Sequence, residues 1–326
     1  MKSRGFLLLA VPLVALAFLP LGGCGGAGDD GWDKSHQGPR VVVSFAPIYC
    51  FAANVAGPDA QVKNVMTTTG PHDFNPTDND AKLLARADLM IVNGLELDNS
   101  LAETLKRGSG NRNLEILDLG ARIPEAQLMQ GECHHDHAGH NHAHSHGMDP
   151  HIWLSPEMAI AMTETIRDKL IQVDPTHEAG YKQRAADYVA KLKALHADGL
   201  AMLKDKKDRK FVTFHEAMNY FARSYKLEIA GVVQKKPGVE PSLDELKALV
   251  KMCEEKKVRL IAVEPQYGRE SSAKAILDEL RRNPALADAA LVELDPLETV
   301  TPAALTPEWY EKKMRANLEA LRDAMK

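Results

Sequence analysis

A long stretch without proline divides the chain into two parts. Between Glu178 and Lys206, apolar residues recur at close to helical spacing, among them Tyr181, Leu192 and Leu203. At ~1.5 Å of rise per residue, such a helix reaches roughly 40 Å. The sequence therefore predicts a rigid connecting helix within 174–208, with one folded unit before it and one after it.

Strand and helix patterns alternate on both sides of this helix. Short apolar runs before it predict strands at 41–45, 61–67, 89–92 and 114–118. The same pattern after it predicts strands at 210–214, 229–233, 258–263 and 290–294. This alternation predicts an α/β fold with two lobes, each a mostly parallel sheet flanked by helices. We expect an N-terminal lobe at 40–173 and a C-terminal lobe at 209–326, which suits a chain of 326 residues.

Capping residues mark where some helices begin. Ser155 followed by Pro156 predicts the N-terminus of a helix that ends the first lobe. Ser242 and Glu245 have the spacing of a capping box at the start of another helix. Two further helices are predicted at 95–106 and 215–225.

The first residues have the pattern of an export signal. Basic residues precede an apolar run at 6–19, which is about as long as a signal-peptide core and shorter than a membrane span. The next four residues, Leu21-Gly22-Gly23-Cys24, resemble the lipobox of bacterial lipoproteins, in which the cysteine becomes acylated. We predict a lipoprotein signal peptide at 1–23, lipidation of Cys24 and a flexible tether at 24–39. The alternative is an ordinary signal peptide with an incidental cysteine, and both place the mature protein outside the cytoplasmic membrane.

Composition and charge are ordinary for a soluble globular protein. Charged residues make up 26% of the chain and its formal net charge is −5, which gives no indication of nucleic-acid binding. Besides Cys24 there are three cysteines, an odd number from which no disulfide can be derived. Cys50 and Cys253 are predicted to be small buried residues, and Cys133 is left without a role. We expect a monomer.

Seven of the 13 histidines lie in one low-complexity segment, which we place in a loop at 132–148. The segment has no apolar periodicity, so we predict a disordered surface loop. Imidazoles at this density would collect metal weakly beside a main site. The histidines of this tract are His134, His135, His137, His140, His142, His144 and His146.

Three other histidines, His72, His151 and His215, share a different context. His72 and His215 follow predicted strands, and open α/β sheets build their ligand sites at the carboxyl ends of strands. Imidazole suits Zn²⁺ and other late transition metals, and three histidines with one carboxylate complete a four-coordinate zinc site. The candidate carboxylates at strand ends are Asp295 and Glu264.

Two more carboxylates adjoin the candidate histidines in sequence. Asp73 follows His72, and Glu216 follows His215, so each is predicted to orient its neighbour or to serve as an alternative ligand. Metal can bind only to deprotonated imidazole, so we expect the affinity to fall below about pH 6.

Several short motifs resemble those of one protein family. They are Gly70-Pro71-His72, Asp149-Pro150-His151-Ile152-Trp153-Leu154, Phe214-His215-Glu216-Ala217, Glu264-Pro265-Gln266 and Leu294-Asp295-Pro296-Leu297. From about residue 40 to residue 326, the chain resembles the zinc- and manganese-specific solute-binding proteins of ABC transporters (ZnuA-like). The resemblance implies two α/β lobes joined by one long helix. It also implies delivery of the captured metal to a membrane permease and its ATPase.

The resemblance further implies a set of ligands. In this family three histidines come from the positions of His72, His151 and His215, and a carboxylate comes from the position that Asp295 matches. Water replaces this carboxylate in some zinc members. Manganese members carry glutamate where this chain has His215, and a histidine-rich insertion is typical of zinc members, so the resemblance favours zinc. A disulfide found in many zinc members is not possible here, because Cys253 is the only cysteine after the connecting helix.

Three other functions remain open from the sequence. A manganese-binding member of the same family would use the same fold. A zinc hydrolase would activate water at an open fourth position, but the chain contains neither an HExxH motif nor a nucleophile elbow. A metal-storing or adhesin lipoprotein would act without a transporter. The function we predict is non-enzymatic capture of Zn²⁺ for an ABC importer.

Overall fold

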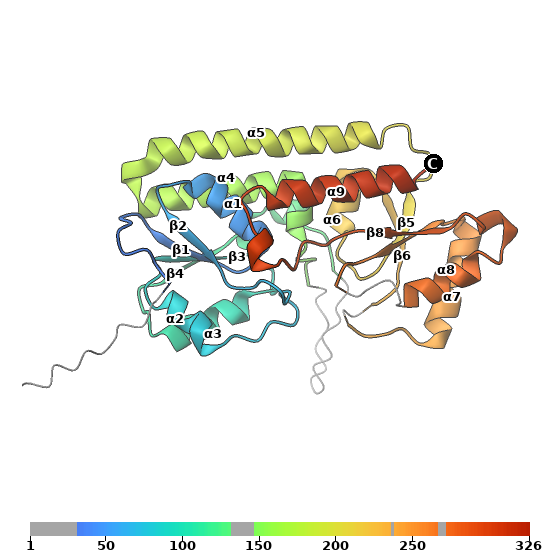
Figure 1. Ribbon diagram of the computed structural model, residues 1–326, viewed down its shortest axis with the longest axis horizontal. Helices are drawn as coiled ribbons and strands as arrows, with labels where there is room; N and C mark the ends of the chain where they lie inside the picture. The colour runs from blue at the N-terminus through green and yellow to red at the C-terminus, as the bar shows by residue number, and fades with distance from the viewer. Residues whose placement is uncertain (1–30, 132–146, 236–237, 267–271) are drawn as a thin grey trace, which may run out of the picture.

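The computed structural model describes residues 31–131, 147–235, 238–266 and 272–326. These residues form two α/β lobes placed side by side along the long axis of the molecule (Figure 1). The predicted signal peptide, Cys24, Cys133 and the seven histidines of the tract lie outside the described residues. Within the described ranges, no helix combines the length and the apolar character needed to cross a membrane.

The N-terminal lobe contains a parallel sheet with the strand order β2-β1-β3-β4. Its strands are β1 (Arg40–Val43), β2 (Gln61–Asn64), β3 (Leu89–Val92) and β4 (Glu115–Asp118). β3 is buried along its whole length because helices cover both faces of the sheet. These helices are α1 (Ala46–Ala56) and α4 (Pro156–Val173) on one face and α2 (Asp78–Leu84) and α3 (Asn99–Ser109) on the other (Figure 1).

The C-terminal lobe repeats this strand order as β6-β5-β7-β8, again with every pair parallel. Its strands are β5 (Lys210–Thr213), β6 (Glu228–Val232), β7 (Leu260–Val263) and β8 (Ala290–Glu293). Its helices are α6 (Asn219–Ser224), α7 (Leu243–Lys256) and α8 (Ser272–Leu280). In both lobes the strand order reverses beside the first strand, and the carboxyl ends at such a reversal are the usual place for a ligand site.

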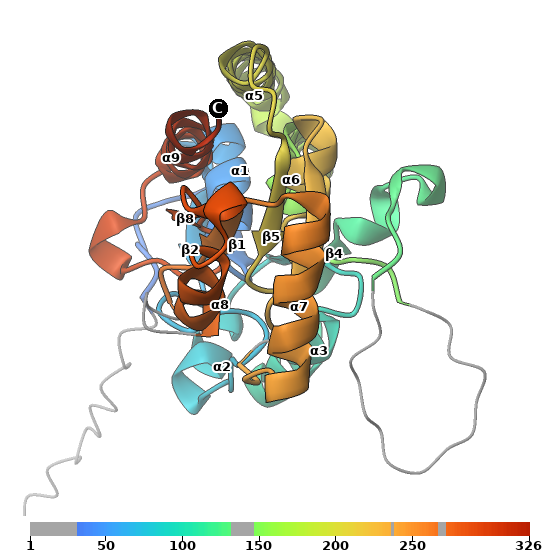
Figure 2. The same ribbon diagram turned by 90° about the vertical axis from the view of Figure 1, so that its right-hand side faces the viewer.

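Three segments join the lobes. Helix α5 (Glu178–Met202) runs along both of them, and α9 (Trp309–Ala324) lies beside it (Figures 1 and 2). Between β8 and α9, the return segment (residues 294–308) passes back against the N-terminal lobe, where the N–H of Val300 donates to the carbonyl of Thr67 at 2.9 Å. The two lobes are therefore tied together by one long helix, one irregular segment and one shorter helix.

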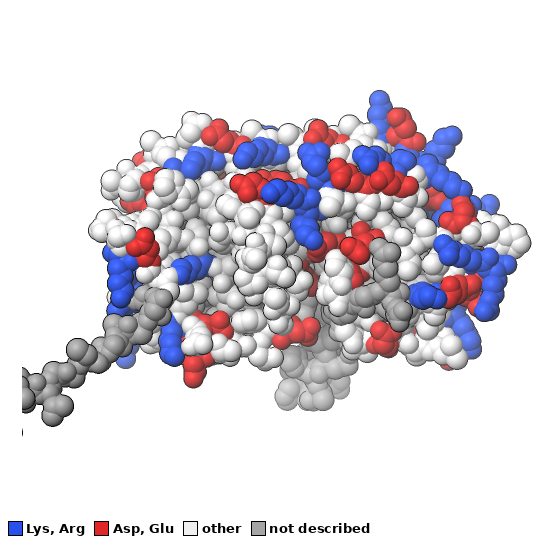
Figure 3. All heavy atoms as spheres, viewed as in Figure 1, with Lys and Arg blue, Asp and Glu red and all other residues white. Residues whose placement is uncertain are grey.

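Charged side chains of both signs occur along α5 and α9 on the face that Figure 3 shows. One pair, Arg315 with Asp198, joins α9 to α5 at 2.8 Å. Exposed pairs of this kind contribute about 1 kcal/mol at most. The two helices also pack closely. Gly199 of α5 allows this because it has no side chain: a Cβ there would lie 2.8 Å from Cδ1 of Leu318 on α9.

The capping residues predicted the starts of two helices. Ser155 accepts a hydrogen bond from the N–H of Met158 at the start of α4, and Ser242 with Glu245 forms the capping box of α7. The long connecting helix is present as α5. The free thiols of Cys50 and Cys253 are buried, as their apolar surroundings predicted.

Two helix starts were predicted wrongly. α3 begins at Asn99 and not at residue 95, because Leu95 and Glu96 adopt positive φ angles of 54° and 67°. α6 begins at Asn219 and not at residue 215, because residues 214–218 form bends and turns, in which the N–H of Ala217 donates to the carbonyl of His215 at 2.9 Å. Both departures lie at the carboxyl ends of strands, where the chain shapes the region between the lobes.

Candidate metal centre

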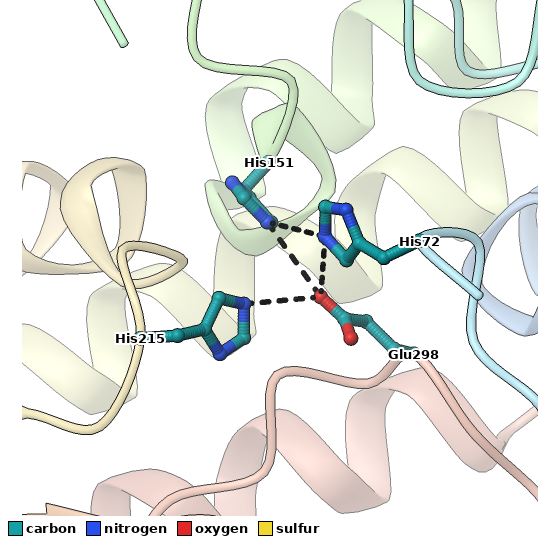
Figure 4. Close-up of side chains that lie close together, drawn as sticks. All are labelled: His72, His151, His215 and Glu298. Carbon is teal, nitrogen blue, oxygen red and sulfur yellow. Dashed lines mark hydrogen bonds and ion pairs between the residues drawn. The ribbon is translucent and has the colours of Figure 1, made fainter. Parts of the chain in front are cut away.

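Four side chains from distant parts of the sequence converge between the lobes (Figure 4). They are His72, His151, His215 and Glu298. Oε1 of Glu298 lies 3.4 Å, 3.6 Å and 3.3 Å from the Nε2 atoms of His72, His151 and His215. The Nε2 atoms of His72 and His151 are 3.3 Å apart. The structure thus brings the three predicted histidines together around one point.

Each of the four comes from a different connection. His72 lies in the loop after β2, and His151 directly precedes the short 3₁₀ helix Ile152–Leu154. His215 follows β5 after one intervening residue, and Glu298 lies on the return segment. The N-terminal lobe therefore supplies two histidines and the C-terminal lobe supplies one. The carboxylate stands on a segment that belongs to neither sheet.

The spacing of these atoms suits a tetrahedral zinc ion. Zinc lies about 2.0–2.2 Å from nitrogen and oxygen ligands, so the ligand atoms of a tetrahedron are about 3.3–3.6 Å apart. Four of the six separations in such a tetrahedron, those given above, fall within this range, and all four ligand atoms lie within 4.8 Å of one another. Nε2 of His215 and Oε1 of Glu298 are also buried without a hydrogen-bond partner among the described residues. Leaving such atoms unpaired is costly, and a cation bound to both would satisfy them.

A carboxylate stands behind each of the two buried histidines. Nδ1 of His215 lies 2.6 Å from Oε1 of Glu264, and Nδ1 of His151 lies 2.7 Å from Oδ1 of Asp149. A proton on Nδ1 donates to the carboxylate and leaves the lone pair of Nε2 pointing into the centre. Gln266 in turn donates to the second oxygen of Glu264 at 2.9 Å. Once the Nε2 proton is lost, both rings are therefore held in the tautomer that binds metal through Nε2.

Residues of the C-terminal lobe hold Asp149 from across the boundary. Nδ2 of Asn219 donates to Oδ2 of Asp149 at 3.0 Å, and the hydroxyl of Tyr220 donates to its carbonyl at 3.1 Å. The same hydroxyl accepts from the N–H of Met129 at 2.9 Å. The orientation of His151 thus depends on the contact between the two lobes.

The buried carboxylates raise the pKa of both histidines. Burial by itself lowers the pKa of His215, but the charges of Glu298 and Glu264 outweigh this effect and raise the pKa to about 10. Burial also opposes protonation of His151, yet Asp149 and Glu298 raise its pKa to about 8. Burial disfavours the charged form of Glu298, but His215 and the nearby imidazoles of His151 and His72 hold the pKa of that carboxyl well below its usual range. A divalent cation must therefore displace protons to bind.

The structure does not place Asp295, the predicted carboxylate ligand, among the converging atoms. Oδ2 of Asp295 lies 2.8 Å from Nζ of Lys313, and its Oδ1 accepts from the N–H of Leu297 at 2.8 Å. Glu298, three residues further on, takes the place beside the histidines. In the sequence, Glu298 directly follows the motif Leu294-Asp295-Pro296-Leu297, which could have marked it as a second candidate. The backbone turn at Leu297, with a φ of 63°, could not be predicted.

The other predicted carboxylates differ in their placement. Glu264 lies behind His215, where it orients the ring, and not among the converging atoms. Glu216 accepts from Asn219 at 3.5 Å. Asp73 is exposed, and the hydrogen bonds found for it in the described residues use its backbone, to Gly70 and Asn75. Asp149 belongs to the motif around His151, but the sequence did not predict that its carboxylate orients this histidine.

Comparison with known proteins agrees with this fold. Residues 41–324 match the family model described as zinc-uptake complex component A, periplasmic. The chain belongs to this family. The predicted family resemblance and the predicted two-lobe α/β fold with one long helix are therefore confirmed.

Members of the family with names and structures resemble the chain over most of its length. It is 32% identical to the zinc-binding protein AdcA of Streptococcus pyogenes, covering 87% of this chain and 55% of that protein. It is 28% identical to the high-affinity zinc uptake system protein ZnuA of Bacillus subtilis, covering 96% of both. A crystal structure of ZnuA, 26% identical, superposes with a TM-score of 0.73 over 89% of this chain and all of that one. The chain spans about half the length of the AdcA relatives it matches.

Proposed function

We propose that the chain captures Zn²⁺ outside the cytoplasmic membrane and delivers it to an ABC-type importer. The convergence of three Nε2 atoms and one carboxylate oxygen, all within 4.8 Å of one another, carries this proposal. The names of the S. pyogenes and B. subtilis relatives, which refer to zinc binding and zinc uptake, support it. His72, His151, His215 and Glu298 are the proposed ligands.

The donor set favours zinc over manganese. Three neutral imidazoles suit zinc, whereas manganese sites favour more oxygen ligands. His215 decides between the two metals. Its imidazole, held in place by Glu264, offers a nitrogen ligand at a position where an oxygen ligand would favour manganese. The buried charges of Glu298, Glu264 and Asp149 supply the compensation that a divalent cation needs.

The same arrangement favours transport over catalysis. A hydrolytic zinc site keeps one position open for water, whereas here Glu298 fills the fourth position beside the histidines. In the proposed function, the partners are a membrane permease and its ATPase, and the chain acts as a monomer. Lipidation of Cys24 would hold it at the membrane; Cys24→Ser should then move the protein from the membrane fraction to the soluble fraction.

Metal analysis of the purified mature protein tests the site. We expect one tightly bound zinc ion per chain, and weaker binding in His72→Ala, His151→Ala and His215→Ala. His177→Ala is the matched control, because this histidine pairs with Asp174 away from the site. Preferential retention of manganese, or unchanged zinc binding in the three variants, contradicts the proposal.

Growth under zinc limitation tests delivery. A strain lacking the protein should grow poorly in medium treated with a chelator and should recover when zinc is added. A plasmid carrying the wild-type chain should restore growth, and one carrying His151→Ala should not. Normal growth of the deletion strain, with zinc still bound by the purified protein, would favour a metal-storing or adhesin role over transport.

A further inference from the structure

Glu298 lies outside both sheets: side chains hold the backbone just before it, and the bond from Val300 to Thr67 holds the backbone just after it. Asn317 of α9, which is 3% exposed, pairs with both backbone groups of Asp295. Its Oδ1 accepts from the N–H of Asp295 at 2.9 Å, and its Nδ2 donates to the carbonyl of Asp295 at 2.8 Å. An amide side chain is suited to this pairing because it offers one donor and one acceptor.

The next residues are held in the same manner. Oδ1 of Asp295 accepts from the N–H of Leu297, and the indole N–H of Trp153 donates to the carbonyl of Pro296, both at 2.8 Å. Leu297 adopts a φ of 63°, a conformation that costs energy for a residue with a side chain. The turn that aims Glu298 at the histidines therefore persists because its neighbours hold it.

We infer that Asn317 is a positioning residue for the carboxylate ligand, although it does not touch the metal site. This inference rests on the proposed function, since it concerns the fourth ligand of that site. Without Asn317, the backbone N–H and carbonyl of Asp295 lose their buried hydrogen-bond partner. The turn at Leu297 then loses the contact that holds its first residue. Glu298 would then be free to leave the position 3.3 Å from Nε2 of His215.

α9 also holds the segment of a second ligand. The hydroxyl of Tyr310 donates to the carbonyl of Trp153 at 2.7 Å, two residues after His151. Trp153 donates to Pro296 in turn, so α9, the His151 segment and the Glu298 segment form one connected set. This set gives α9 a direct influence on the metal geometry, which a helix that only closed the fold would not have.

A double-mutant cycle on zinc affinity tests the inference. Substitutions behind a metal ligand typically weaken binding about 10- to 100-fold, and we expect this loss for Asn317→Ala. In the background of Glu298→Ala the same substitution should cost no further affinity, because its effect passes through Glu298. An equal loss in both backgrounds, or no loss in the wild-type background, overturns the inference. If Asn317→Ala does not fold, Asn317→Asp, which keeps the acceptor and loses the donor, takes its place in the cycle.

Cobalt substitution gives an independent signature. The visible absorption of bound Co²⁺ reports the coordination of the metal, so Asn317→Ala and Glu298→Ala should share one altered spectrum. Arg315→Ala, which removes an exposed ion pair from the same helix, should keep the wild-type spectrum. A wild-type spectrum in Asn317→Ala overturns the inference. Failure of the wild-type protein to bind zinc or cobalt would instead contradict the proposed function.

Discussion

The metal centre has a deep side and a shallow side. His151 and His215 form the deep side: their side chains are 6% and 1% exposed, and each is backed by a buried carboxylate. His72 forms the shallow side, with a side chain that is 25% exposed. Among the described residues, no carboxylate lies behind the Nδ1 atom of His72.

This difference suggests that the two sides have separate roles, one in zinc affinity and the other in entry of the ion. The deep histidines are oriented before metal arrives, so little ordering is needed when the ion binds. His72 is the ligand that faces solvent, and its ring can move at smaller cost. We infer that the ion enters and leaves past His72, while the deep side determines how tightly it is held.

Lowering the pH should produce the largest effect on zinc affinity if the two deep histidines determine how tightly the ion is held. The pKa values of about 8 for His151 and about 10 for His215 mean that zinc must displace both protons below about pH 8. Affinity should therefore fall roughly 100-fold per pH unit below pH 8 and roughly tenfold per unit between pH 8 and pH 10. Histidines with ordinary pKa values would lose affinity only below about pH 6, as the sequence predicted. Competition titrations from pH 6 to pH 9 measure the slope, and a flat profile between pH 7 and pH 9 contradicts the assignment.

Removing one ligand from each side compares them directly. His215→Ala removes a ligand that Glu264 already orients, so zinc affinity should fall by more than about 100-fold, since even residues behind a ligand are worth about 10- to 100-fold. His72→Ala should cost at least tenfold less, because water can reach the vacated position. Competition with a zinc-binding dye measures both. Equal losses would mean that the two sides do not differ in energy.

The sequence predicted the deep and shallow histidines equally well, and the supporting residues poorly. The strand-end rule located His215 after β5 and His72 after β2, although β2 contains only one apolar residue, Val62. Glu298 was missed because its position depends on a positive φ at Leu297, which the contacts of residues 295–297 with Asn317 and Trp153 hold in place. The role of Asp149 depends on residues of the other lobe, and no local pattern reports how two lobes meet.

The carboxylates behind the ligands should matter only on the deep side. Glu264→Ala frees the ring of His215 and removes a charge that raises its pKa, so affinity should fall about 10- to 100-fold. The pH dependence between pH 8 and pH 10 should also become weaker, which a general loss of stability would not produce. Asp73→Ala, the matched change beside His72, should alter the affinity less than about threefold, since the exposed Asp73 side chain orients nothing at the centre. A larger effect of Asp73→Ala than of Glu264→Ala would reverse the comparison.

The smallest effect should follow removal of the histidine tract at 134–146. Within the described residues, the backbone next to the tract is fixed independently of it: the N–H of Gly131 donates to the carbonyl of Gly147, and the N–H of Asp149 donates to the carbonyl of Met129, both at 2.9 Å. Replacing the tract by a short Gly-Ser linker keeps these bonds and the position of His151. We expect one tight zinc site with affinity within about threefold of the wild type, and loss of the weaker additional binding at higher zinc concentration. Calorimetric titration resolves both phases; if the tight phase disappeared, the tract would be part of the main site, and the division into a deep and a shallow side would be incomplete.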